Sequence, residues 1–289
     1  MTKQEFKQKI KYWLPPIIFD KLQYLKAYKN FLQYKNLVTN NIELKDKHKG
    51  KRCFILGSGP SIKQEDLKPL KNEIVFALNN FYVHADFKTI MSGEVPKYYM
   101  TAPIHKPQTE KEWKDWFEDM EKFVPQSTTM LLGLNSYKEN IKYIFDKYSV
   151  FQKHNINWYF AGVNINDFYQ FNIKDIDVSN MIWSANTVSI YAIIMAIYMG
   201  FDEIYLLGMD HNYMCIQKEN NYRFYQNAIH QRKEIERTNF SNTNEFLATG
   251  KALLLYEILY KNINTNIYNC SDNSLIDTFE YQNLKDILK

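Results

Sequence analysis

Cysteine is scarce in this chain of 289 residues, which contains only Cys53, Cys215 and Cys270. The three share no spacing typical of a metal or redox site, and Cys53 and Cys270 lie in short apolar runs. We therefore expect buried free thiols, which indicates a reducing compartment.

The sequence also lacks the apolar runs that membrane insertion requires. Its N-terminus has no apolar signal region, and no uninterrupted apolar stretch is long enough to span a bilayer. We expect a cytoplasmic protein that is either soluble or peripheral on the inner membrane face.

Several chemistry-bearing motifs are missing as well. There is no P-loop, no G-x-S-x-G elbow and no zinc-protease motif. The triplet Asp175-Ile176-Asp177 has the D-x-D spacing of metal-dependent glycosyltransferases, but it lies in irregular sequence. We interpret it as a solvated acidic turn and expect no metal site.

The chain does contain enough apolar residues for a hydrophobic core, and its charged residues are unevenly distributed along the sequence. Hydrophobic residues make up 45% and aromatic residues 16%, which excludes global disorder. Residues 1–52 hold 13 Lys and Arg against 4 Asp and Glu, a net of +9, whereas the rest of the chain has a net of −5. A basic arm on a mildly acidic body argues against a nucleic-acid binder.

Residues 1–50 are predicted to form a basic amphipathic N-terminal arm. After Pro15-Pro16, apolar side chains recur at helical spacing among lysines. Such a helix can lie on an anionic membrane, here through residues 1–37. The alternative is that its stripe packs on the body or on a second subunit, so homo-oligomer formation stays open. Residues 39–51 are predicted to be a linker.

Residues 51–289 are predicted to form one α/β domain. Apolar runs predict strands that alternate with helical stretches, which is typical of a Rossmann-like, doubly wound parallel sheet. Polar or irregular segments near 151–183 and 212–243 are predicted to be lid-like insertions. The predicted strands are 53–56, 74–78, 98–101, 130–134, 203–207 and 266–270, and the predicted helices are 17–32, 110–123, 136–148, 186–199, 244–262 and one near the C-terminus.

The strongest motif is a glycine loop after the first predicted strand. Its glycines would let an anion approach the backbone, and Ser61 with Gln64 has the spacing of a helix capping box. We predict that it binds the phosphate of a nucleotide, with an empty tight turn as the alternative. The glycine loop is Gly57, Ser58, Gly59, Pro60 and Ser61.

Polar residues follow three other predicted elements. Asn79 and Asn80 end the second strand, where their amides could bind a base or ribose, or cap a turn. A cap cluster before the 186–199 helix could offer hydroxyls and amides to a ligand, or only cap the helix. The cluster comprises Ser184, Asn186 and Thr187.

The strand at 203–207 ends in Gly208, Met209, Asp210 and His211. A carboxylate beside a histidine at this edge could orient a base or contact ribose. His230 could enter the same cleft from the 212–243 segment, whereas His84 looks incidental.

Together these motifs resemble the bacterial sialyltransferases of the small Campylobacter-type family. The resemblance covers about residues 51–276 and includes the glycine loop, Asn79 to Tyr82, 184–200, 203–210 and 273–275. It implies a metal-independent inverting transfer from a CMP-linked sugar acid to a surface-glycan acceptor, in lipopolysaccharide or capsule synthesis. It also implies that Tyr222 and, roughly, Tyr213 bind the departing phosphate.

One departure concerns the general base of that family, a histidine before the penultimate helix. Residues 246–251 contain no histidine. Either His211 or His230 then deprotonates the acceptor, or the chain is a divergent relative with other chemistry.

The same features also resemble proteins similar to archaeal 6-hydroxymethylpterin pyrophosphokinase, which have a glycine–proline loop and a strand ending in Gly-x-Asp. That resemblance implies an ATP- and Mg²⁺-dependent phosphotransferase, with Asp210 as a metal ligand. A non-catalytic nucleotide-binding protein of a glycan pathway is the third hypothesis. We expect no cofactor apart from the nucleotide-sugar donor, with Mg²⁺ only under the second hypothesis.

Overall fold

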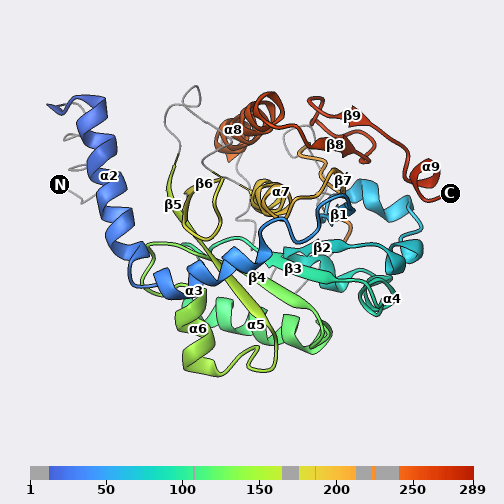
Figure 1. The fold of residues 1–289 in the computed structure, drawn as a ribbon, viewed down its shortest axis with the longest axis horizontal. Coiled ribbons are helices and arrows are strands. Elements are labelled where there is room, and N and C mark those ends of the chain that lie inside the picture. Colours follow the sequence, from blue (N-terminus) through green and yellow to red (C-terminus); the bar gives the residue numbers. More distant parts are fainter. Residues whose placement is uncertain (1–12, 107, 165–175, 186, 213–222, 226–240) are drawn as a thin grey trace.

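The computed structural model describes residues 13–106, 108–164, 176–185, 187–212, 223–225 and 241–289. Within these residues nine parallel strands form one sheet, in the order β6-β5-β4-β3-β2-β1-β7-β8-β9. Helices cover both faces of this sheet (Figure 1). The predicted Rossmann-like α/β fold is therefore confirmed.

The strands are β1 (Arg52–Leu56), β2 (Val75–Leu78), β3 (Lys97–Thr101), β4 (Thr129–Leu134), β5 (Ile156–Asn164), β6 (Met181–Ser184), β7 (Glu203–Leu207), β8 (Asn266–Asn269) and β9 (Glu280–Tyr281). The α-helices are α2 (Pro16–Phe31), α3 (Lys35–Thr39), α4 (Phe87–Met91), α5 (Glu110–Phe123), α6 (Ile141–Tyr148), α7 (Val188–Tyr198), α8 (Ser241–Asn262) and α9 (Leu284–Ile287). Short 3₁₀ helices are η1 (Asn40–Leu44), η2 (Pro60–Gln64), η3 (Lys68–Asn72) and η4 (Asn79–Val83).

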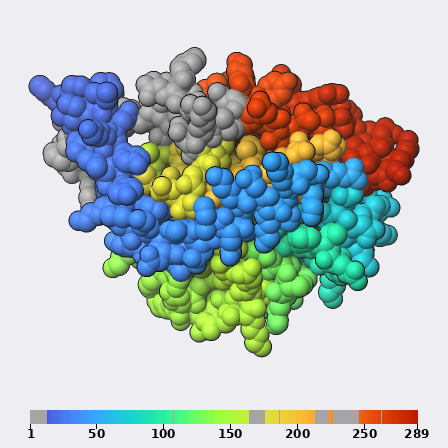
Figure 2. Space-filling view, in the orientation of Figure 1, coloured from blue at the N-terminus to red at the C-terminus, as the bar shows by residue number. Residues whose placement is uncertain are grey.

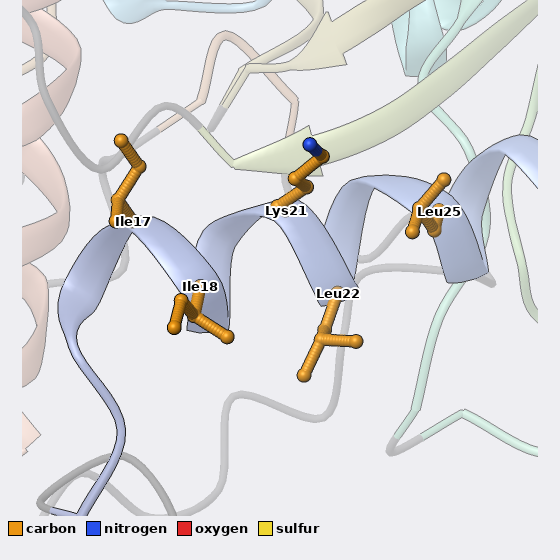
Figure 3. Close-up of a pocket in the computed structure, with 5 residues that line it drawn as sticks. All are labelled: Ile17, Ile18, Lys21, Leu22 and Leu25. Atoms are coloured by element: carbon orange, nitrogen blue, oxygen red, sulfur yellow. The ribbon is translucent and has the colours of Figure 1, made fainter.

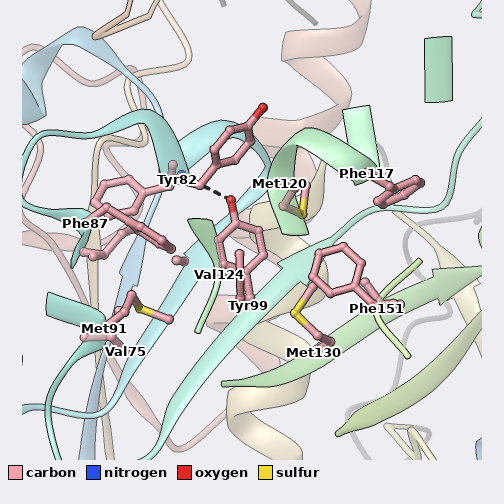
Figure 4. Packing of buried hydrophobic residues seen from close by; sticks show 14 of the residues in the cluster. Val75, Tyr82, Phe87, Met91, Tyr99, Phe117, Met120, Val124, Met130 and Phe151 are labelled. Carbon is pink, nitrogen blue, oxygen red and sulfur yellow. Dashed lines mark hydrogen bonds between the residues drawn. The ribbon is translucent and has the colours of Figure 1, made fainter. Parts of the chain in front are cut away.

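Alternation along the buried strands divides the core into two clusters, one on each face of the sheet. In β1, Phe54 and Leu56 join the cluster beneath α4, α5 and α6, while Cys53 and Ile55 join the cluster beneath α7 and α8. Successive strand side chains point to opposite faces, so a strand buried on both sides must be apolar throughout. Figure 4 shows the first cluster, where side chains of α4 and α5 meet those of β2, β3 and β4.

The C-terminal half of the N-terminal arm is part of the folded body rather than a linker. Phe31 packs edge to face on Phe160 of β5, with ring centroids 5.6 Å apart. Asn41, in η1, is fully buried and donates to the carbonyls of Trp158 and Val178 at 2.7 and 2.8 Å. The prediction of a linker at 39–51 is therefore wrong, because long-range hydrogen bonds hold this polar segment in place.

Residues 151–183 were predicted to be irregular, and this is wrong for the part that forms β5 and β6. β5 has nine residues and pairs with β4 from Met130↔Ile156 onward. Its aromatic side chains favour a strand, and its asparagines are accommodated because Asn157 hydrogen-bonds toward the arm at Glu43. α6 is also shorter than predicted, since Asn140 caps it by accepting from the Tyr143 amide.

Cys53 and Cys270 are buried free thiols, as predicted. Burial raises the pKa of the Cys270 thiol to about 12. Among the residues that the structure describes, no helix has the length and apolar content needed to cross a bilayer.

Candidate functional site

The order of strands places a switch point between β1 and β7. From β1 the chain adds strands in one direction as far as β6, then returns through α7 and adds β7, β8 and β9 on the other side (Figure 1). Ligands of open α/β folds bind outside the carboxyl ends of the strands at such a point. Here the loops after β1 and β7 are the glycine loop and residues 208–211.

These two loops cross at a distance that requires glycine. The amides of Gly57 and Gly59 donate to the carbonyls of Leu207 and Gly208, each at 2.8 Å. A Cβ on Gly57 would lie 2.5 Å from the Gly208 carbonyl oxygen, and Gly208 has a φ of +65° that disfavours other residues. Close contact between two strand ends therefore explains the glycines without a bound phosphate.

Asp210 fills much of the space that the glycine loop would offer an anion. One carboxylate oxygen accepts from the Ser61 amide at 2.9 Å, and the other accepts from the Ser61 hydroxyl. A Cβ on Gly59 would lie 2.5 Å from the Asp210 Cγ. Burial raises the pKa of Asp210, while the two bonds from Ser61 and the charge of Arg223 oppose that rise. The loop therefore already holds one negative group, a side chain of the protein itself.

The bond to Asp210 also changes the secondary structure after the loop. The predicted α-helix with a Ser61–Gln64 capping box is wrong, because Pro60–Gln64 is a single 3₁₀ turn without a side-chain cap. The Ser61 hydroxyl and amide, which a helix cap would use, bind the carboxylate instead. Hydrogen bonds to a charged acceptor are stronger than neutral ones, so the carboxylate is the favoured partner.

Residues 223–225 lie over the carboxyl ends of β1 and β2. Arg223 Nη1 donates to Ser58 Oγ at 2.9 Å, and the Phe224 amide donates to the Ser58 carbonyl at 3.0 Å. Asn80 Nδ2 donates to the Tyr225 hydroxyl at 2.9 Å. Burial raises the pKa of Asp210 and lowers that of His211, and the charge of Arg223 acts to lower both. Its guanidinium therefore lies within electrostatic reach of both side chains.

The two asparagines after β2 have different roles. Asn80 is buried and its Oδ1 accepts from the indole of Trp116 at 2.5 Å, so its amide is used inside the protein. Asn79 has a φ of +47°, and its carbonyl accepts from the hydroxyl of Tyr99. The Asn79 side chain is half-buried and makes no hydrogen bond within the described residues. Of the pair, Asn79 is the better placed to bind a ligand.

His211 is turned inward rather than toward the glycine loop. It is 5% exposed, and its Nε2 lies 2.9 Å from the hydroxyl of Tyr256 on α8. That hydroxyl lies 2.5 Å from Ser189 Oγ, which in turn lies 2.8 Å from Thr187 Oγ1. Burial, with the charge of Arg223, lowers the pKa of His211 to about 4. The imidazole is therefore neutral at physiological pH and connected by hydroxyls to the start of α7.

The residues of the cap cluster have different hydrogen-bond partners. Thr187 is the N-cap of α7 but makes no side-chain cap bond, and its hydroxyl joins the network instead. Ser184 Oγ lies 3.3 Å from the hydroxyl of Tyr191. Four other predicted site residues lie outside the described residues, namely Asn186, Tyr213, Tyr222 and His230.

Sequence reasoning missed the two side chains that organise the site, Arg223 and Tyr256. Arg223 adjoins Tyr222, which the resemblance singled out and which lies outside the described residues. Tyr256 interrupts an apolar run in α8, and such a buried hydroxyl usually has a partner. A single hydroxyl within an apolar run is the sequence feature that could have identified Tyr256.

No group of three or more His, Cys, Asp or Glu side chains suited to a metal ion occurs in the part of the chain that the structure describes. Asp177, in the D-x-D triplet, accepts from the amide and hydroxyl of Ser179 at 3.0 and 2.6 Å. Asp177 thus lies in a turn, and Asp175 lies outside the described residues.

A scan against protein-family models finds no match, and a search of curated proteins finds none either. Among solved structures the chain is similar to the sialyltransferase CstII from Campylobacter jejuni in complex with a substrate analogue, cytidine-5'-monophosphate. The two share 19% sequence identity over 81% of this chain and 85% of that chain, with a TM-score of 0.42. A similarity at this level carries no conclusion about the activity or site of this protein.

Proposed function

We propose that this protein is a glycosyltransferase that binds a nucleotide sugar at the crevice between β1 and β7. The observation that carries the proposal is the guanidinium of Arg223, which Ser58 holds over the glycine loop at the switch point. Because Asp210 already occupies the loop, an incoming phosphate needs a separate positive charge. Arg223 supplies it in a geometry suited to phosphate oxygens.

The donor in this proposal is a CMP-linked sugar acid. Asn79, at the end of β2, contacts the nucleoside through its side-chain amide. Tyr213 directly follows residues 187–212 in the sequence, and Tyr222 directly precedes residues 223–225. We propose that the hydroxyls of both tyrosines donate hydrogen bonds to the phosphate as it departs. No divalent ion is required, because the positive charge comes from Arg223.

The reaction is a single displacement with inversion. The acceptor hydroxyl oxygen attacks the anomeric carbon, the bond from that carbon to the phosphate oxygen breaks, and CMP leaves with the electron pair. The acceptor proton passes to a histidine, either His211 or His230.

A base with a pKa of about 4 would accept a proton poorly, and Arg223 offers a way to raise it. Burial is the largest cause of the low pKa of His211, and the charge of Arg223 lowers it further. A bound phosphate compensates that charge, so the pKa of His211 rises when the donor binds. Histidine NMR titrations with and without CMP measure this directly, and an unchanged His211 pKa in the complex would rule out His211 as the base.

The acceptor in this proposal is a surface glycan carried on a lipid, as in lipopolysaccharide or capsule synthesis. Such an acceptor is made at the inner membrane face, which would place the enzyme peripherally there. Assays with lipid-linked and soluble acceptor saccharides distinguish this from a soluble acceptor.

Calorimetry with CMP, UMP, ADP and ATP, each with and without Mg²⁺, tests the nucleotide assignment. We expect metal-independent binding of CMP. Arg223→Gln should weaken CMP binding roughly 10- to 100-fold, which corresponds to the ~1.5–3 kcal/mol of a charged hydrogen bond. Arg52→Gln is the matched control, because Arg52 pairs with Glu73 at 2.6 Å at the opposite end of β1.

The other outcomes identify the remaining hypotheses. Mg²⁺-dependent binding of ATP would favour a phosphotransferase of the pyrophosphokinase type. An absence of nucleotide binding would leave a non-catalytic role. Equal loss of CMP affinity in the Arg223 and Arg52 variants would show that Arg223 has no specific part in recognition.

A further inference from the structure

α2 has apolar side chains on two opposite sides, and within the described residues one of these sides is buried and the other is exposed. Phe19, Ala27 and Phe31 are buried, and Phe31 packs on Phe160 of β5. The opposite side carries Ile18, Leu25 and Leu32, spaced seven residues apart and 46%, 53% and 50% exposed. We call this row, together with Leu22, the outer stripe.

The outer stripe is large and accessible. At 1.5 Å per residue, the 14 steps from Ile18 to Leu32 span roughly 21 Å. α2 stands at one edge of the molecule in Figures 1 and 2. Ile18 and Leu22 point away from the same side of the helix (Figure 3). Together with Ile17, Lys21 and Leu25 they line a pocket on the surface of α2. An exposed apolar surface of this extent marks an interaction site.

Charge around the outer stripe indicates what covers it. By helical spacing Lys21 and Lys26 flank the stripe on its two sides and Lys29 lies within it, and all three are exposed. Residues 13–39 contain four lysines and a single acidic residue, Asp20. Three residues before α2, Trp13 is 87% exposed, and tryptophan is favoured at the boundary between lipid and water.

We propose that the outer stripe of α2 binds the surface of an anionic lipid membrane. Its leucines and isoleucines enter the boundary between headgroups and acyl chains, while Lys21, Lys26 and Lys29 contact anionic headgroups. A second copy of the chain is a poorer partner, because pairing two such stripes would bring like-charged lysines together. This proposal stands on the surface of α2 and does not depend on the reaction proposed above.

The helix is already ordered before it meets a membrane. Phe31 and Tyr34 both pack on Phe160, and Asn140 donates to the Tyr34 hydroxyl at 2.8 Å. Because these contacts fix the end of the arm, membrane binding does not have to order α2. Binding should therefore require few lipid contacts and remain reversible.

Vesicle co-sedimentation of the full chain tests the proposal, with phosphatidylcholine vesicles compared against mixed phosphatidylcholine–phosphatidylglycerol vesicles. We expect binding to the mixed vesicles that weakens with salt. Lys21→Gln with Lys29→Gln should lower the partition coefficient roughly 30-fold, from about 1 kcal/mol per lysine near the surface. Leu22→Gln with Leu25→Gln should lower it at least ~10-fold, because apolar burial is lost.

Matched controls lie elsewhere on the surface. Phe246→Gln with Leu247→Gln removes two apolar side chains of α8 that are 59% and 54% exposed. Lys88→Gln with Lys111→Gln removes two exposed lysines of α4 and α5. Both control pairs should bind the mixed vesicles as the unaltered protein does.

Two results would overturn the proposal. The first is unchanged vesicle binding in either α2 double variant, with circular dichroism confirming that the variant is folded. The second is a dimer in sedimentation velocity that the Leu22→Gln, Leu25→Gln variant converts to a monomer, which would assign the stripe to a second copy.

Discussion

Two buried histidines should make the stability of this protein fall steeply between pH 6.5 and about 4. His48 is 3% exposed and its Nε2 lies 2.6 Å from the hydroxyl of Tyr98, while His211 contacts Tyr256. Burial is the largest cause that lowers the pKa of each from 6.5 to about 4, with nearby lysines adding to the effect at His48 and Arg223 adding at His211.

The direction of the change in stability with pH follows from how many protons the folded and unfolded states bind. Below pH 6.5 the unfolded chain protonates both imidazoles, while the folded protein keeps them neutral until about pH 4. The unfolded state therefore gains protons first, and the free energy of unfolding decreases as the pH falls through this window. At about 1.4 kcal/mol for each pH unit, the full loss is ~3 kcal/mol for each histidine.

Urea denaturation at stepwise pH values from 7.5 to 4.5 measures this loss. His48→Gln and His211→Gln replace each imidazole with a side chain that does not titrate. Each variant should lose less stability with falling pH than the unaltered protein, and the double variant should lose least. His105→Gln, at an exposed position, is the control. If the unaltered protein and both single variants lost stability in parallel, the assignment of this pH dependence to His48 and His211 would be wrong.

Three further changes test the packing around the site and the arm. Gly59→Ala places a methyl group against the Asp210 carboxylate, so it should lower the free energy of unfolding by about 1–3 kcal/mol and weaken nucleotide binding. An unchanged melting temperature would contradict the tight crossing of the loops. Tyr256→Phe removes the hydroxyl that joins His211 to α7, so it should lower the free energy of unfolding by about 1–2 kcal/mol and shift the NMR resonances of the His211 ring. Unchanged ring resonances would contradict this contact. Asn41→Ala leaves two backbone carbonyls near β5 and β6 without their donor and should cost about 1–3 kcal/mol in urea denaturation, whereas no loss would contradict a structural role for η1.

Elements whose boundaries depend on local chemistry were predictable from the sequence. α5 runs from Glu110 to Phe123 as predicted, because Thr109 and Glu112 form a reciprocal capping box at its start. β7 also agrees with the prediction, since an apolar run buried on both faces stops at Gly208. In both cases a few neighbouring residues decide where the element begins or ends.

Elements that depend on distant partners were not predictable in the same way. β5 contains asparagine and aromatic residues that favour an irregular interpretation, yet it pairs along β4 and receives the Asn41 amide from 117 residues away. η2 is a 3₁₀ turn because Asp210, 149 residues later, binds the Ser61 groups that would cap an α-helix. Neither contact leaves a pattern in the local sequence.

At the glycine loop the structure supplies a second cause for the glycines, beside the predicted binding of a phosphate. Glycine after a buried strand predicted close backbone approach, and the structure has that approach, but the approaching group is the loop after β7. The amides of Gly57, Gly59 and Ser61 all have partners within the protein, and the nearest anion is Asp210. Under the proposed function, a donor phosphate would therefore be recognised by groups that reach the switch point from elsewhere. Arg223 is the described side chain that does so, since it binds Ser58 from 165 residues away. On the proposal that Arg223 binds the donor phosphate, nucleotide binding should depend on residues 223–225 as much as on the glycine loop.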